Sequence, residues 1–129
     1  MRAGTPPGDR CAMTSITLAA PTVTTRREKI AAGLALPLGT MTCVGGIVFW
    51  EWSALTWIAA IALAMGASYL FNGVRVLRGD AAGLHPLLLT AYVHIAFTIA
   101  KLAIWQETEA TVFGIVAIAI ALLLRGRAR

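Results

Sequence analysis

The sequence has little charge, and this scarcity decides its broad class. Only 13% of its 129 residues are charged, whereas 58% are hydrophobic and the mean hydropathy is +0.76. A soluble domain carries about 25% charged residues, and a chain this small buries only a modest fraction of its apolar surface. The composition therefore excludes a disordered chain, a secreted disulfide scaffold and a nucleic-acid-binding module, and it predicts a membrane protein.

Cysteines and acidic residues within the apolar runs are also lacking. The two cysteines are Cys11, in a polar segment, and Cys43, in an apolar run, and no C-x-x-C pair occurs. Thiol relays and cysteine-type zinc sites are therefore excluded. The apolar spans contain no Asp or Glu, and His85 and His94 stand on one predicted helix, about 13.5 Å apart along its axis. Neither a metallohydrolase centre nor a doubly histidine-ligated haem fits. We expect no metal and no cofactor.

The sequence does contain four long apolar runs. They cover about residues 30–50, 54–74, 86–105 and 110–124, and about 20 residues of helix cross a bilayer of about 30 Å. Short connections make consecutive helices antiparallel neighbours. We predict an all-α, polytopic membrane fold in which four transmembrane helices form a compact antiparallel bundle over residues 25–129. Residues 1–24 read as a mobile polar tail, within which Met13 is an alternative start.

Local signals mark the ends of these helices. Thr25 and Glu28 have the spacing of a capping box, which predicts the start of the first helix. Residues 51–53, Glu-Trp-Ser, predict a tight turn with Ser53 as the N-cap of the second helix. Pro86 suits the first turn of the third helix, and Thr108 is a candidate cap for the fourth.

Basic residues predict the orientation. In the predicted four-span layout, ten of the eleven basic residues fall on the same side of the membrane as both termini. They are Arg2, Arg10, Arg26, Arg27, Lys29, Arg75, Arg78, Arg125, Arg127 and Arg129. The positive-inside rule then places both termini in the cytoplasm. The arginine- and alanine-rich usage favours a bacterial inner (plasma) membrane. Tryptophans anchor the outer boundary, where such side chains prefer the lipid interface; they are Trp50, Trp52, Trp57 and Trp105.

Small residues predict the packing faces, because helices in lipid associate through close contact. Three helices carry them at helical spacing: Ala31, Ala35, Gly39 and Cys43 on the first, Ala60, Ala64 and Ser68 on the second, and Ala110, Gly114, Ala117 and Ala121 on the fourth.

A polar stripe on the third helix is the main candidate site. Thr90, His94, Thr98 and Lys101 fall within an arc of about 80°. A lysine in mid-bilayer costs about 2.5–3.5 kcal/mol, so one interpretation has Lys101 reaching the outer surface to pair with an acidic residue there, namely Glu51, Glu107 or Glu109. His94 is either a neutral, hydrogen-bonded structural residue or a proton relay or ligand contact.

A second polar group lies toward the cytoplasmic end of the spans: Ser68, Tyr69, Asn72 and Tyr92. Hydrogen bonds between helices explain such residues by default. The alternative is a polar vestibule open to the cytoplasm.

Three functions remain open on these grounds. The first is a non-catalytic accessory or structural subunit of a membrane assembly, which fits the absence of reactive clusters. The second is a small oligomeric transporter or channel that uses the stripe on the third helix. The third is an enzyme acting on a lipid or quinone. The expected partners are the lipid bilayer and either further copies of the chain or a larger membrane protein, with no nucleic acid.

Overall fold

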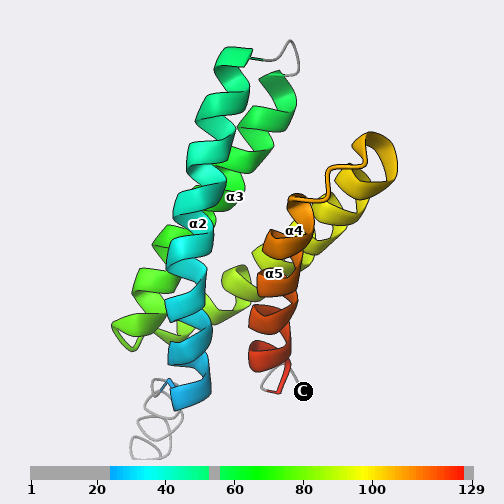
Figure 1. Ribbon diagram of the computed structural model, residues 1–129. Coiled ribbons are helices and arrows are strands. Elements are labelled where there is room, and N and C mark those ends of the chain that lie inside the picture. Colours follow the sequence, from blue (N-terminus) through cyan, green and yellow to red (C-terminus); the bar gives the residue numbers. More distant parts are fainter. Residues whose placement is uncertain (1–23, 53–55, 127–129) are drawn as a thin grey trace, which may run out of the picture.

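The computed structural model describes residues 24–52 and 56–126, and all regular secondary structure in these residues is helical (Figure 1). The helices are α2 (Arg26–Trp52), α3 (Thr56–Leu77), α4 (Leu84–Trp105) and α5 (Ala110–Arg125), with a short 3-10 turn, η1 (Ala81–Gly83), before α4. α2, α3 and the segment formed by η1 and α4 are each long and apolar enough to cross a membrane, while α5 is apolar but shorter. The all-α prediction is thus confirmed for the described part of the chain.

The start of α2 has the predicted capping box. The Thr25 amide donates to Glu28 Oε2 at 2.7 Å, and the Glu28 amide donates to Thr25 Oγ1 at 3.4 Å. These two bonds satisfy amides that a helix N-terminus otherwise leaves without partners. The first membrane-span candidate therefore begins where the sequence predicts it.

Other helix ends differ from the prediction. Glu51 and Trp52 are the last two residues of α2 rather than part of a turn, because neither residue type breaks a helix; Ser53 lies outside the described residues. Thr108 does not cap α5 with its side chain: the N-cap position is Glu109, which makes no side-chain capping bond. α4 ends at Trp105, the last residue of the third predicted run, and its C-cap is Gln106, whose φ of 54° is left-handed.

α3 extends beyond its predicted end and stops at a glycine. The Gly79 amide donates to Val76 O and the Asp80 amide donates to Arg75 O. With a φ of +93° at Gly79, this is a Schellman C-cap, in which the left-handed residue is ordinarily glycine. Asp80 then accepts a bond from the Ala82 amide and starts η1.

Two of the three predicted small-residue faces form helix contacts. Gly39 and Gly66 face each other across α2 and α3, where a Cβ on Gly66 would meet Cys43 Sγ and lie 2.8 Å from Gly39 O. All four small residues on α5 are buried, and a Cβ on Gly114 would lie 2.7 Å from Thr98 Cγ2. On the predicted α3 face, Ser68 contacts α4 but the two alanines are exposed.

Ala60 and Ala64 are exposed, because α3 turns a different face to its neighbours. The face in contact carries Ala59, Gly66 and Gly73, spaced seven residues apart, and all three are buried. Hydropathy does not distinguish the two faces, since α3 is apolar and rich in small residues all round.

The helices form two hairpins that lie close together at one end. Figure 1 shows α2 and α3 side by side and α4 leaning away from α3 toward its own C-terminal end, while α5 packs against both α4 and α2. The buried core lies where the hairpins converge, and its largest fully buried side chains are Tyr69, Val76, Leu87 and Ile120.

Charge is separated along the molecule. The start of α2, the turn after α3 and the end of α5 lie at the same end in Figure 1, and a Cβ on Gly126 would lie 4.0 Å from the Arg27 guanidinium. This end, called here the basic end, carries every basic residue of the described part except Lys101. Arg2, Arg10, Arg127 and Arg129 lie outside the described residues.

Candidate functional site

The predicted stripe on α4 faces the interior of the molecule. Thr90, His94 and Thr98 are all buried, and Lys101 follows on the same side with its side chain 17% exposed. Spacings of four, four and three residues keep the four side chains on one helical face, and that face is turned to the other helices.

Near the basic end, hydroxyl and amide groups connect α3 to α4. Asn72 Nδ2 donates to Ser68 O at 2.9 Å and to Ser68 Oγ at 3.2 Å. Ser68 Oγ and Thr90 Oγ1 are 2.7 Å apart, and Thr90 also donates to Pro86 O at 2.8 Å. These three side chains therefore form a short hydrogen-bonded chain between two membrane-span candidates.

Tyr69 and His94 stand at the centre of the molecule. Both are buried, and their ring centroids are 5.7 Å apart at a tilt of 49°. Neither Tyr69 Oη nor His94 Nδ1 has a hydrogen-bond partner within the described part of the protein. Buried polar atoms usually have partners, and an unsatisfied one costs about 1–3 kcal/mol. This pair is the strongest indication of a functional site on α4.

At the other end, Lys101 pairs with an acidic residue of the α4–α5 turn. Its Nζ lies 2.9 Å from Glu107 Oε2, and it also lies 5.7 Å from the centroid of the Phe97 ring. Glu107 is one of the three partners expected for this lysine. The interaction allows a charged amine in an apolar helix.

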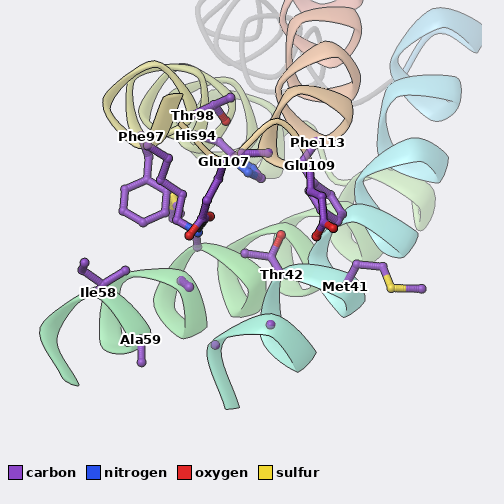
Figure 2. A pocket seen from close by; sticks show the side chains of 16 residues that line it. Met41, Thr42, Ile58, Ala59, His94, Phe97, Thr98, Glu107, Glu109 and Phe113 are labelled. Atoms are coloured by element: carbon purple, nitrogen blue, oxygen red, sulfur yellow. Dashed lines mark hydrogen bonds and ion pairs between the residues drawn. The ribbon is translucent and has the colours of Figure 1, made fainter. Parts of the chain in front are cut away.

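A cavity of about 210 Å³ lies between the two hairpins on the side where they diverge. Figure 2 shows its walls: Met41 and Thr42 come from α2, Ile58 and Ala59 from α3, and the side chains of His94, Phe97 and Thr98 from α4.

The α4–α5 turn and α5 close the same cavity. Glu107, Glu109 and Phe113 contribute there, and Figure 2 shows Glu109 beside Phe113. Lys101 completes the polar lining. Three residues of the stripe, His94, Thr98 and Lys101, therefore share one cavity, whereas Thr90 belongs to the hydrogen-bonded chain with Ser68.

The predicted vestibule group is only partly brought together. Ser68, Tyr69 and Asn72 lie at the α3–α4 contact, but Tyr92 is 48% exposed on another face of α4. Tyr92 is two residues from Thr90, about 200° round the helix, so the two cannot share a face. The cavity between the hairpins is lined by none of the four.

The predicted tryptophan anchors are described in part. Trp57 and Trp105 are exposed near helix ends away from the basic end, while the side chains of Trp50 and Trp52 lie outside the described residues. Over residues 24–52 and 56–126, no three His, Cys, Asp or Glu side chains gather as metal ligands would.

Several cavity residues were not found by sequence reasoning. Phe97 lies three residues after His94 and one helical turn from it, a spacing that was available as a signal. Phe113 and Met65 join the cavity only through the way the helices pack, so no local pattern identifies them, and Glu109 was predicted only as a partner of Lys101. Comparison of the chain with protein-family models, curated proteins and solved structures finds no match.

Proposed function

We propose that the chain is an integral membrane protein with four spans and both termini in the cytoplasm. The basic end supports this orientation, because basic residues are retained on the cytoplasmic side. The 16 residues of α5 extend about 24 Å, which a locally thinned bilayer accommodates. The arginine-rich composition favours a bacterial plasma membrane.

Within that membrane, we propose that the chain is a small transporter or channel that moves protons, alone or with a solute. One observation carries this proposal: polar side chains run from Asn72, Ser68 and Thr90 near the basic end to His94 and Thr98 in the cavity. Ionisable groups inside a membrane are costly, so their presence there favours a functional role.

His94 is the residue on which transport would depend. Imidazole takes up and releases protons near neutral pH. The groups that face it are Tyr69 from α3 and Thr98 and Lys101 from its own helix, and Glu107 and Glu109 line the same cavity. A proton that enters beside the acidic turn would be taken up by His94, and the hydroxyl groups of Thr90 and Ser68 follow toward the basic end.

The test is proton flux into liposomes that contain the purified protein and a pH-sensitive dye. We expect His94→Gln to reduce flux about tenfold or more. The matched control is His85→Gln, which removes the exposed histidine at the start of the same helix and leaves flux unchanged. Flux that is no greater than in empty liposomes, or that is equal in the His94 variant, would reject this function.

An accessory or structural subunit is the second candidate. The exposed Ala60 and Ala64 favour it, because small residues on an outward helix face allow another helix to approach closely. Purification from the native membrane in mild detergent distinguishes the two functions. A stoichiometric larger partner supports the accessory role, whereas copies of the chain alone support an oligomeric transporter. A lipid- or quinone-linked enzyme remains the third proposal, and the cavity displays no catalytic set for it.

A further inference from the structure

The cavity between the hairpins has an unusual combination of walls. Two aromatic rings, Phe97 and Phe113, and two thioethers, Met41 and Met65, make most of it apolar and polarisable. Its volume of about 210 Å³ exceeds the roughly 150 Å³ that suffices for a benzene-sized guest. It therefore suits a compact aromatic or branched apolar group.

The charges in the cavity favour a cation. Lys101 and Glu107 pair with each other at 2.9 Å, so their charges largely cancel. Glu109 is exposed at the start of α5 and makes no ion pair with the described residues. Its carboxylate gives the cavity a net negative charge. This charge repels a carboxylate ligand and attracts an ammonium ion.

The third feature of the cavity is the buried side chain of His94. The side chain is 5% exposed and lines the cavity, and its Nδ1 has no hydrogen-bond partner in the described part of the chain. Ring faces such as that of Phe113 attract organic cations, and the His94 imidazole adds a polar ring to the cavity wall. Carboxylate, aromatic ring and imidazole thus lie around one cavity.

We propose that this cavity binds a small primary amine in its protonated form, with the ammonium group at Glu109 and the apolar group between Phe113 and Met65. The amine is then a candidate solute for the proposed transport function. Only this biological role of the amine rests on that function. Binding itself is an equilibrium property and is measurable without any flux.

The experiment compares two probes of similar shape and opposite charge, phenethylamine and phenylacetate. Full-length protein is placed in nanodiscs of zwitterionic phosphatidylcholine, and binding at pH 7 is measured by equilibrium dialysis after subtraction of empty nanodiscs. We expect the amine to bind at least about tenfold more tightly than the carboxylate, which corresponds to about 1.4 kcal/mol.

Two charge-removing variants make the test specific. Glu109→Gln changes an exposed side chain, so folding is preserved, and it should abolish the preference for the amine. Asp80→Asn removes the same charge at the opposite end of the protein and should leave the preference intact. Equal binding of both probes, tighter binding of phenylacetate, or a preference that survives in Glu109→Gln overturns the proposal. Amine binding without proton flux rejects only the transport function, and flux without amine binding rejects only this inference.

Discussion

At the scale of single residues, glycine has opposite roles within one helix. Gly33 and Gly39 both lie in α2, but a Cβ on Gly33 would meet nothing within 4 Å, whereas one on Gly39 would lie 2.9 Å from Gly66 O. The same residue type is therefore required at one position and costs backbone entropy at the other. The two positions differ because Gly39 lies against α3 and Gly33 does not.

This contrast predicts the effect of two alanine substitutions. Gly66→Ala places a methyl group against Cys43 Sγ and 2.8 Å from Gly39 O, and we expect it to destabilise the protein by about 1–3 kcal/mol. Gly33→Ala, the control, should be neutral or stabilise by up to about 1 kcal/mol. Unfolding by SDS in mixed micelles, followed by circular dichroism, measures both. Equal midpoints for the two variants would contradict the close α2–α3 contact.

Asp80 supplies a pH-dependent prediction at the same scale. The bond from the Ala82 amide and the Arg75 side chain, 2.6 Å away, together hold the pKa of Asp80 below its ordinary value of 3.8. A lowered pKa in the folded state means that the contribution to stability is present above pH 3.8 and is lost as the pH falls through the lowered value.

We therefore expect hydrogen-exchange protection of the Ala82 amide to persist at pH 4 and to fall only in more acidic solution. Asp80→Asn keeps an oxygen acceptor but carries no charge, so its protection should not change over this range. Loss of protection in the unaltered protein already above pH 4 would show that the carboxylate is not held in its charged form.

At the scale of elements, α4 and α5 depend on a contact between a glycine and a threonine. Gly114 lies so close to Thr98 that a Cβ would be 2.7 Å from the threonine methyl group. Thr98 also lines the cavity. The second hairpin thus positions a candidate site residue through a packing contact rather than a hydrogen bond.

A double-mutant cycle tests this contact. We expect Gly114→Ala to destabilise by about 1–3 kcal/mol, and Thr98→Ser, which removes the clashing methyl group, to recover part of that loss in the double variant. The interaction energy of such neighbours is commonly about 0.5–3 kcal/mol, and the SDS midpoints of the four proteins give it directly. Strictly additive effects would mean that the two residues do not touch.

At the scale of the whole molecule, the proposed topology places the turn after α3 in the cytoplasm and the α4–α5 turn outside. Arg78→Cys and Thr108→Cys report on these turns once Cys11 and Cys43 have been replaced by alanine. We expect a membrane-impermeant maleimide to label the Thr108 variant in intact spheroplasts and the Arg78 variant only after permeabilisation.

The reverse labelling pattern would invert the orientation, and labelling of both variants from outside would mean that α4 does not cross the membrane. The charge distribution is the reason for our expectation. All described basic residues except Lys101 lie at the basic end, and moving such residues across a membrane is unfavourable.

Hydropathy, charge and capping residues were enough to predict helices, their approximate limits, the start at Thr25 and the inward stripe of Thr90, His94 and Thr98. These features are local, or repeat with the period of one helix, so a linear pattern records them. The same patterns failed at Glu51, which continues α2 because its residue type does not break a helix, and at Thr108, which is not the N-cap residue of α5.

Only the tertiary structure decided which face of α3 is buried, that the hairpins diverge, and that Glu109 and Phe113 join His94 in one cavity. Each of these depends on how two helices approach each other. In an apolar membrane helix most faces have similar hydropathy, and close packing of small residues selects among them. That selection is a property of helix pairs, and it determines where the candidate site lies.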